Sequence, residues 1–307
     1  MNIVFMGTPD FAAESLEAFI SAGHNVTAVF TQPDKPLGRK HILTAPPVKE
    51  CAQKHNIPVF QPESVRTADA VEQIKSQNPD VCVVVAYGKM LPDDILKVAK
   101  HGCINVHASL LPKYRGASPI QWSIVCGERK TGVATMLLDS GMDTGDVLQM
   151  RECEIKDTDT AETLWDRLST LGAELICDTL KAVENGTVTR TPQDHSLATY
   201  APIIKKEDGL IDFNKSAYVI DCLIRGLHNW PVAYTYADGK RLKIYSATPF
   251  ERNCDAGEIL QADGKLIIGC GENTALEITE LQLEGSKRMN TADFLRGKTI
   301  TSLKGVN

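Results

Sequence analysis

The 307-residue sequence has no run of about 18 uninterrupted apolar residues, the length that a membrane-spanning helix needs. Met1 leads directly into a strand-like run, Asn2-Ile3-Val4-Phe5-Met6, without the basic region or the cleavage site of an export signal. We therefore expect a cytoplasmic protein with no membrane partner.

The nine cysteines form no pair at the spacing of a metal site, and their odd number does not suit a framework of disulfides. Several of them resemble Cys82, which lies in an apolar run where a free cysteine packs as a small hydrophobic side chain. We expect a reducing environment, no structural zinc and no catalytic metal.

An excess of positive charge is also missing. The formal net charge is -6, which argues against the broadly basic surface of a general nucleic-acid-binding protein. From Lys205 onward the sequence carries 14 basic and 14 acidic side chains, so the acidic excess lies before this residue. A nucleic-acid partner would have to be bound by local basic patches.

Short β-branched runs alternate with amphipathic helical patterns through the first two-thirds of the chain. The expected strands are residues 2–7, 25–31, 58–61, 81–86, 103–108 and 132–139. The expected helices include residues 11–22, 47–55 and 160–184. Strands separated by helices indicate an α/β fold with a doubly wound, mostly parallel, Rossmann-like sheet. Such sheets bind ligands beyond the carboxyl ends of their strands.

The last third of the chain has a different pattern. One short helix is expected near residues 216–225, followed by short strands with hairpin signals at Asp238-Gly239 and Asp263-Gly264. We expect a catalytic domain over residues 1–187, a linker over 188–208 and a small OB-like β-barrel domain over 209–307.

The segment Cys103-Ile104-Asn105-Val106-His107-Ala108-Ser109-Leu110-Leu111-Pro112 is the most informative one. Alternate residues of a strand share a face, so Asn105, His107 and Ser109 point the same way. Three polar groups on one face, next to a loop limited by a proline, indicate a site.

A second polar group follows the apolar run 132–138. In Asp139-Ser140-Gly141-Met142-Asp143-Thr144-Gly145-Asp146 the two glycines allow sharp turns. Asp143 is the candidate for a functional carboxylate, whereas Asp139 and Asp146 are expected to form turns or caps.

Asn105, His107 and Asp143 together suit acyl transfer to an amine without a covalent enzyme intermediate. Asn105 and His107 can donate hydrogen bonds to a developing oxyanion, a contribution of roughly 3–4 kcal/mol per donor. A histidine can also exchange protons near neutral pH, with Asp143 holding it in its charged form or accepting a proton through water.

Other interpretations remain open at this point. A single histidine on a strand is commonly a hydrogen-bonded structural residue, and Asn105 or Asp143 taken alone is typical of a turn or a cap. A Ser-His-Asp triad through Ser109 lacks the Gly-x-Ser-x-Gly elbow. A nicotinamide oxidoreductase lacks its Gly-x-Gly-x-x-Gly turn, because the sequence reads Gly7-Thr8-Pro9-Asp10-Phe11. A non-enzymatic RNA-binding module would leave the polar groups without a role.

These motifs resemble the methionyl-tRNA formyltransferases, a family of 10-formyltetrahydrofolate-dependent enzymes. The resemblance runs in order along nearly the whole chain through Gly7-Thr8-Pro9-Asp10-Phe11-Ala12, Phe30-Thr31-Gln32-Pro33-Asp34-Lys35-Pro36, Val83-Val84-Val85-Ala86-Tyr87-Gly88, residues 104–112, residues 139–146 and Asn229-Trp230-Pro231. The Asn-x-His-x-Ser-Leu-Leu-Pro segment is shared by formyltransferases with other acceptors, so by itself it indicates the folate and not the acceptor.

The resemblance implies a catalytic trio of Asn105, His107 and Asp143. It also implies that 10-formyltetrahydrofolate is the co-substrate, with the pterin near the backbone of residues 87–91. The implied folate contacts are Ser109, Leu110, Leu111 and Pro112.

The acceptor is implied by residues 31–47, which carry Lys35, Arg39, Lys40 and His41 and are too long and polar for a tight connection. In the family this loop reaches the tRNA acceptor stem, and Arg39 stands where the family has an arginine. The function that follows is formylation of the methionine amino group on initiator methionyl-tRNA, by an enzyme that we expect to be a monomer. The alternative is a small amine acceptor, glycinamide ribonucleotide or an amino sugar nucleotide.

Overall fold

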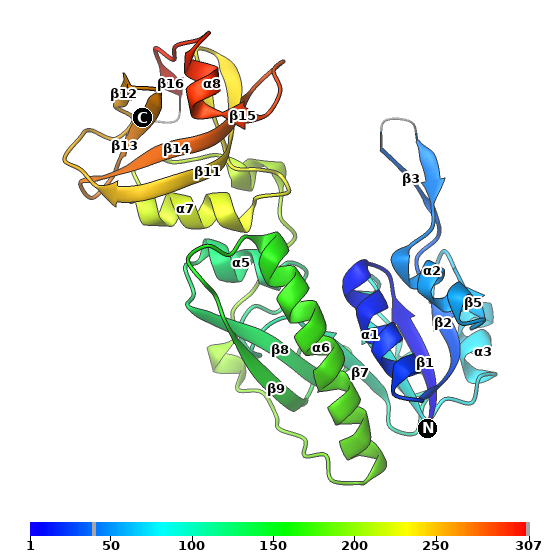
Figure 1. The fold of residues 1–307 in the computed structure, drawn as a ribbon. Coiled ribbons are helices and arrows are strands. Elements are labelled where there is room, and N and C mark those ends of the chain that lie inside the picture. Colours follow the sequence, from blue (N-terminus) through cyan, green and yellow to red (C-terminus); the bar gives the residue numbers. More distant parts are fainter. Residues whose placement is uncertain (39–40, 305–307) are drawn as a thin grey trace. The chain divides into compact units, whose positions relative to one another are not determined.

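The structure, a computed structural model, describes residues 1–38 and 41–304 (Figure 1). The chain forms two compact units. The first consists of Met1–Gly116, Thr131–Glu154 and Trp165–Ala201, and the second of Ala117–Lys130, Ile155–Leu164 and Pro202–Asn307. None of the helices in the described ranges has the length and apolarity needed to cross a membrane.

A seven-stranded sheet with the order β5-β2-β1-β6-β7-β8-β9 forms the first unit. Its strands are β1 (Asn2–Gly7), β2 (Asn25–Phe30), β5 (Val59–Phe60), β6 (Val81–Val85), β7 (Cys103–His107), β8 (Lys130–Leu137) and β9 (Val147–Glu154). The pairs among β5, β2, β1, β6 and β7 are parallel, whereas β8 runs antiparallel to β7. The predicted α/β fold with a mostly parallel sheet is confirmed, and β9 is an additional strand.

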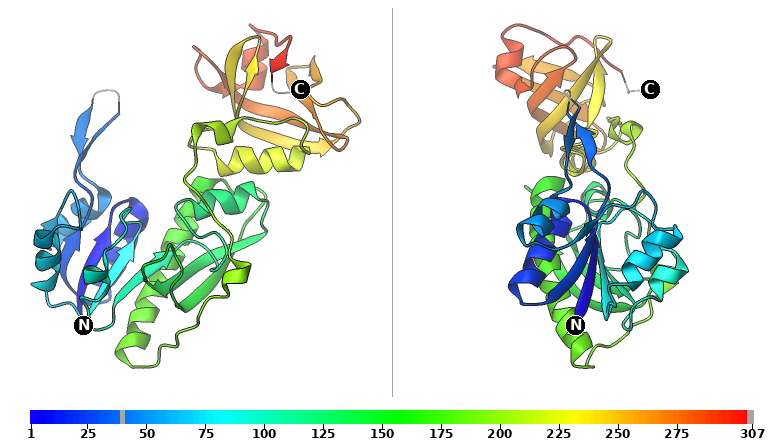
Figure 2. Two further views of the ribbon diagram at one scale, coloured as in Figure 1. Left: turned by 180° about the vertical axis from the view of Figure 1, so that it is seen from behind. Right: turned by 90° about the vertical axis from the view of Figure 1, so that its right-hand side faces the viewer.

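Helices cover both faces of this sheet, as the right-hand view of Figure 2 shows. They are α1 (Asp10–Ser21), α2 (Pro47–Lys54), α3 (Ala68–Lys75), α4 (Asp93–Leu96) and the long α6 (Ala161–Glu184). Alternation along β1 explains the arrangement: Val4 and Met6 pack in a buried cluster with residues of α3 and α4. Phe5 points to the other face, where its ring lies 5.8 Å from that of Phe19 on α1.

The segment expected to be a polar loop, residues 31–47, contains a two-stranded antiparallel hairpin, β3 (Lys35–Leu37) and β4 (Ile42–Thr44). It stands off the sheet of the first unit (Figure 2). Ile42 and Leu43 expose 63% and 66% of their surface, so β4 carries apolar side chains without packing partners. The base of the hairpin is held by Asp34, which accepts hydrogen bonds from Lys49 and Gln61.

The second unit contains α5 (Pro119–Val125), α7 (Ala217–Gly226) and an antiparallel sheet of order β12-β13-β14-β11-β10-β16, with β15 beside β14. Its strands are β10 (Tyr234–Ala237), β11 (Lys240–Glu251), β12 (Ile259–Ala262), β13 (Lys265–Cys270), β14 (Thr274–Leu283), β15 (Met289–Asn290) and β16 (Leu303–Lys304), with α8 (Thr291–Leu295) after β15. Asp238 and Asp263 have left-handed backbones and, with the glycine after each, join β10 to β11 and β12 to β13. The predicted antiparallel β domain and both hairpin turns are confirmed.

Candidate active site

His107 is the last residue of β7, and its ring is buried. Its Nε2 atom lies 2.9 Å from the carbonyl oxygen of Tyr114. A carbonyl oxygen can only accept a hydrogen bond, so Nε2 must carry a proton. In the neutral ring the lone pair is therefore on Nδ1, which is the nitrogen that can accept a proton.

Asp143 faces this second nitrogen, with its Oδ2 atom 3.8 Å from Nδ1 of His107. The same oxygen accepts a hydrogen bond from the backbone N–H of Gly116 at 2.8 Å. Only 17% of the Asp143 side chain is exposed, so little water screens its charge from the imidazole. The carboxylate therefore lies on the side of the ring that carries the Nδ1 lone pair.

The chain brings Asp143 to His107 by a different route from the one that the sequence suggested. Because β8 is antiparallel, Leu137 at its end pairs with Ile104 near the start of β7. The loop over residues 139–146 therefore begins away from His107 and folds back to reach it. The rule that ligands bind beyond the ends of parallel strands accounts for His107 and does not account for Asp143.

Two residues let this loop fold back. Gly145 packs directly against β8, where a Cβ atom would lie 1.8 Å from the carbonyl oxygen of Leu137, so no larger residue fits. Asp139 forms a turn, because its Oδ1 atom accepts a hydrogen bond from the backbone N–H of Gly141 at 2.9 Å. The turn-forming role predicted for Asp139 is confirmed.

Asn105 lies two residues before His107 on the same face of β7 and is half-buried. Among the residues that the structure describes, its carboxamide has no hydrogen-bond partner. A carboxamide offers both donor and acceptor atoms. The Asn105 side chain is therefore available to a ligand oxygen beside His107.

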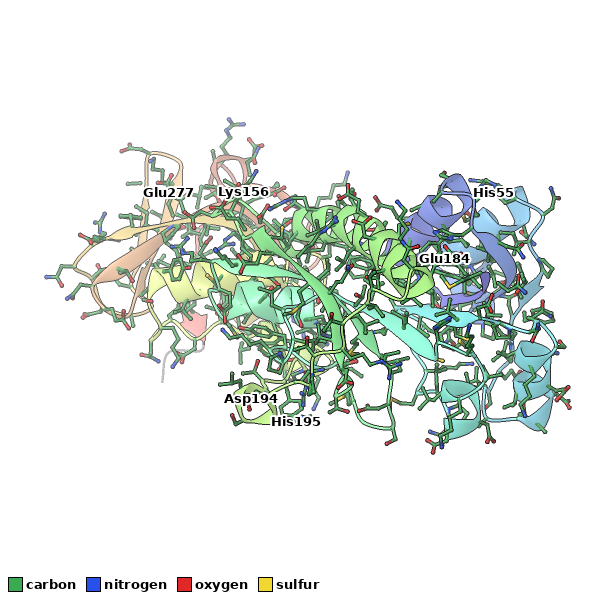
Figure 3. The ribbon with its side chains drawn as sticks, turned by 90° about the horizontal axis from the view of Figure 1, so that it is seen from below. His55, Lys156, Glu184, Asp194, His195 and Glu277 are labelled. Atoms are coloured by element: carbon green, nitrogen blue, oxygen red, sulfur yellow. The ribbon has the colours of Figure 1, made fainter. Side chains whose placement is uncertain are left out.

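Behind the site lies a buried cation that the sequence analysis missed. Arg115 is only 2% exposed, and its guanidinium donates to Oε1 of Gln193 at 3.1 and 2.6 Å. It also contacts Nδ1 of His195, which Figure 3 labels, at 3.1 Å. Nε2 of Gln193 in turn donates to the carbonyl oxygens of Asp143 and Gly145, at 3.0 and 2.7 Å. Arg115 and Gln193 therefore position the backbone that carries the Asp143 carboxylate.

The side chains expected to contact folate differ in accessibility. Ser109 is fully buried and donates to the carbonyl oxygen of Lys113 at 2.6 Å, and Leu111 packs in a core cluster beneath the sheet. Leu110 and Pro112 are half-exposed. In this conformation only the latter two can offer side-chain surface to a ligand.

Tyr87 is the first residue of the segment expected near the pterin. Its backbone carbonyl accepts hydrogen bonds from neighbouring segments, whereas its ring lies in the core. Its carbonyl oxygen accepts hydrogen bonds from Thr8 and Gln32. The ring belongs to the core, burial raises the pKa of Tyr87 to about 12, and its hydroxyl has no partner within the described part of the chain. Arg39, the candidate tRNA contact, lies outside the described residues.

Sequence profiles of two domains match this chain. The profile described as formyl transferase matches residues 1–180, and the one described as formyl transferase, C-terminal domain, matches residues 203–299. The chain belongs to the formyl transferase family. Every residue of the His107 site described above, apart from Gln193 and His195, lies within the first of these formyl transferase matches.

Curated relatives in the formyl transferase family are similar over their full length. The methionyl-tRNA formyltransferase of Geobacter metallireducens is 51% identical over 299 residues, covering 97% of this chain and 96% of the relative. That of Caldanaerobacter subterraneus subsp. tengcongensis is 50% identical over 303 residues, covering 98% of both chains. Both relatives therefore match the two units together and not one domain alone.

Two solved structures share the fold at low sequence identity. An N-formyltransferase from Helicobacter canadensis, in complex with folinic acid and dTDP-3-aminofucose, has a TM-score of 0.68 and 18% identity, covering 90% of this chain and 98% of the other. HypX from Aquifex aeolicus in complex with tetrahydrofolic acid has a TM-score of 0.62 and 19% identity, covering 95% of this chain and 46% of the other.

In the described parts of this formyl transferase, one group of three metal-ligand side chains comes together, Glu17, Cys51 and His55. All three belong to α1, α2 or the residue after α2, and none belongs to the segments around His107. The residues of the His107 site offer hydrogen bonds and a proton acceptor. These groups suit acyl transfer, and none of them is assigned to a metal.

Proposed function

We propose that this formyl transferase moves the formyl group of 10-formyltetrahydrofolate to the α-amino group of methionine on initiator methionyl-tRNA, for translation initiation. The observation that carries the proposal is the identity of 48–51% over 97–98% of the chain to relatives named methionyl-tRNA formyltransferase. The arrangement of His107, Asp143 and Asn105 supports it, because these groups suit transfer of an acyl group between two nitrogens.

Nδ1 of His107 is the atom that accepts and later returns the proton. The neutral methionine amine attacks the formyl carbon, which forms a carbon–nitrogen bond and moves the carbonyl electrons onto oxygen. The attacking nitrogen then gives a proton to Nδ1, because Nε2 is already bonded to the Tyr114 carbonyl. Asp143 stabilises the imidazolium that results.

The carboxamide of Asn105 donates a hydrogen bond to the oxyanion of this tetrahedral intermediate. When the carbonyl re-forms, the bond between the formyl carbon and N10 of the folate breaks, and the Nδ1 proton passes to N10. Tetrahydrofolate and the formylated amine leave, and His107 is neutral again. The same nitrogen serves as base and then as acid, so no residue needs to form a covalent bond.

Folate recognition is assigned to the edge of the sheet where β6 and β7 end. The backbone of residues 87–91 would receive the pterin, and Leu110 and Pro112 offer half-exposed apolar surface beside it. Ser109 and Leu111 would act by holding this loop in shape, since both are buried.

The tRNA is assigned to the β3–β4 hairpin with Arg39, and to the domain over residues 209–307. The hairpin follows β2, which places it on the ligand side of the parallel sheet. The second unit adds cations stacked on aromatic rings: Arg241 lies 4.9 Å from the centre of the Tyr234 ring, and Arg288 lies 4.0 Å from that of Tyr245. Arginine side chains can bind the phosphates of a nucleic acid, although Tyr234 is buried and Arg288 also pairs with Glu280.

The experiment compares acceptors with 10-formyltetrahydrofolate as donor. Methionyl initiator tRNA should be formylated with a kcat/KM far above that of glycinamide ribonucleotide or an amino sugar nucleotide. A preference for either small amine would overturn the proposed acceptor, and the proposed folate-dependent transfer would still hold. If the folded protein transferred no formyl group to any of these acceptors, both the proposed acceptor and the proposed folate chemistry would be wrong.

A further inference from the structure

Glu17, Cys51 and His55 bring three ligand types together on the surface of the first unit. Sγ of Cys51 lies 3.3 Å from Oε2 of Glu17, and Nε2 of His55 lies 3.1 Å from both carboxylate oxygens. All three ligand atoms lie within 4.8 Å of one another. Figure 3 labels His55 beside the blue helices.

Two of the three separations among these atoms match the edges of a zinc tetrahedron, and the third, between sulfur and nitrogen, is at most 4.8 Å. With Zn–S near 2.3 Å and Zn–N or Zn–O near 2.0 Å, the sulfur-to-oxygen edge is about 3.5 Å and the nitrogen-to-oxygen edge about 3.3 Å. The observed separations of 3.3 and 3.1 Å are within a few tenths of an ångström of these values. Small rotations of the side chains would admit the ion.

The backbone supports this geometry. Cys51 and His55 are four residues apart at the end of α2, so their side chains lie on one side of the helix, where Glu17 of α1 meets them. Cysteine, histidine and glutamate are all ligands that zinc accepts. The expectation of no structural zinc considered only the spacing of the cysteines along the sequence; contrary to it, we propose that Glu17, Cys51 and His55 form a non-catalytic zinc site that links α1 to α2.

Exposure leaves room for a fourth ligand. Cys51 is buried, whereas the side chains of His55 and Glu17 are 33% and 53% exposed, so a water molecule can complete the tetrahedron from the solvent side. Without metal the thiol donates a hydrogen bond to Glu17; on binding, the thiol proton leaves to solvent and the thiolate bonds to zinc. The Lys54 ammonium is the nearby charge that opposes the ion.

The expected consequence is mechanical. The residues before α2 form the β3–β4 hairpin, and Asp34 already ties the base of that hairpin to Lys49 of α2. A metal bond between α1 and α2 would therefore fix the helix from which the hairpin extends. The site acts on folding stability and contributes no group to the proposed formyl transfer.

The test uses the full-length protein, freed of metal by a chelator and returned to chelator-free buffer. Titration with Co²⁺ should give one equivalent of binding with a thiolate-to-cobalt charge-transfer band, which Zn²⁺ should abolish by displacement. Addition of Zn²⁺ alone should raise the thermal midpoint. A titration without this band, or a midpoint that zinc does not raise, would overturn the site.

Variants locate the ligands. Cys51→Ser should remove the charge-transfer band, and His55→Gln should weaken Co²⁺ binding by at least about tenfold, as loss of a ligand does. His55 is exposed, so the His55→Gln variant tests the site even if Cys51→Ser folds poorly. The control is Cys126→Ser, which removes an exposed thiol outside the group and should bind as the wild type does. Wild-type binding by His55→Gln, or loss of the band in Cys126→Ser, would contradict the assignment.

Discussion

Gln193→Glu is the substitution that isolates the support behind the candidate active site. Gln193 is buried, receives two hydrogen bonds from Arg115 and gives two, to the carbonyl oxygens of Asp143 and Gly145. A glutamate of the same size keeps the bonds from Arg115 and gains an ion pair with it. It cannot donate to the two carbonyls, because both of its oxygens are acceptors at neutral pH.

The size of the effect follows from these four bonds. Two neutral hydrogen bonds contribute roughly 1 kcal/mol each, so their loss costs about 2 kcal/mol, partly offset by the new ion pair with Arg115. An acidic oxygen in place of Nε2 would face carbonyl oxygens at 2.7 and 3.0 Å, so the loop carrying Asp143 has to move. A displacement of about 1 Å at a catalytic group can lower turnover by roughly 100-fold. We therefore expect a folded variant with kcat lowered between about 10-fold and 100-fold.

The assay pairs urea unfolding with single-turnover formyl transfer to methionyl initiator tRNA. The control is Gln73→Glu, the same change at an exposed position of α3, which should leave both the unfolding midpoint and turnover unchanged. A folded Gln193→Glu enzyme with wild-type turnover would show that Asp143 does not depend on Gln193. An equal loss in Gln73→Glu would show that added charge alone lowers turnover.

Four further outcomes are expected. Asn105→Ala and Asp143→Ala should each lower kcat by ~100-fold or more with the fold retained, and stopped-flow turnover close to wild type in either would remove that residue from the mechanism. Arg39→Ala, and also Arg39→Lys, should lower kcat/KM for tRNA and leave folate affinity unchanged. Each should also reduce the slope of tRNA affinity against salt concentration by about one unit. Equal losses for tRNA and folate would reject Arg39 as a specific tRNA contact. Dialysis against a strong chelator should leave formyl transfer by the folded protein intact, whereas a loss that zinc restores without raising the thermal midpoint would make the metal catalytic. Hydrogen bonds from Gln61, and then from Lys49, lower the pKa of Asp34. The stability that this carboxylate contributes is therefore complete above the unfolded pKa of about 4 and is lost as the pH falls. In Asp34→Asn the free energy of unfolding in urea should depend less on pH below about pH 4, and a pH profile identical to that of the wild type would contradict this.

The local sequence pattern was sufficient to predict most helices and strands of the α/β unit. β1 is buried on both faces and reads as a continuous apolar run, so its bounds, Asn2–Gly7, agree with the expected ones. The long helix α6 likewise ends at Glu184, the last residue of the expected helix 160–184. By contrast, β9 alternates buried, half-buried and exposed residues with charged side chains among them, and the sequence pattern did not distinguish it from a loop.

Long-range contacts could not be predicted in the same way. Asp143 meets His107 only because the loop after the antiparallel strand β8 folds back, and nothing in the composition of β8 fixes the direction of that strand. Arg115 and Gln193 are 78 residues apart, and no local sequence pattern links them. The hairpin in residues 31–47 was missed because β3 and β4 are three residues each and lie among prolines and glycine.

We propose that Nδ1 of His107 carries the proton between the amine and the folate. The most direct measurement is a single-turnover reaction of the protein with 10-formyltetrahydrofolate and methionyl initiator tRNA, followed by release of the amino acid and its identification by mass. The wild type should yield N-formylmethionine, and a folded His107→Ala variant should yield it at a rate lower by ~100-fold or more. Formation of N-formylmethionine at the wild-type rate by His107→Ala would contradict the account.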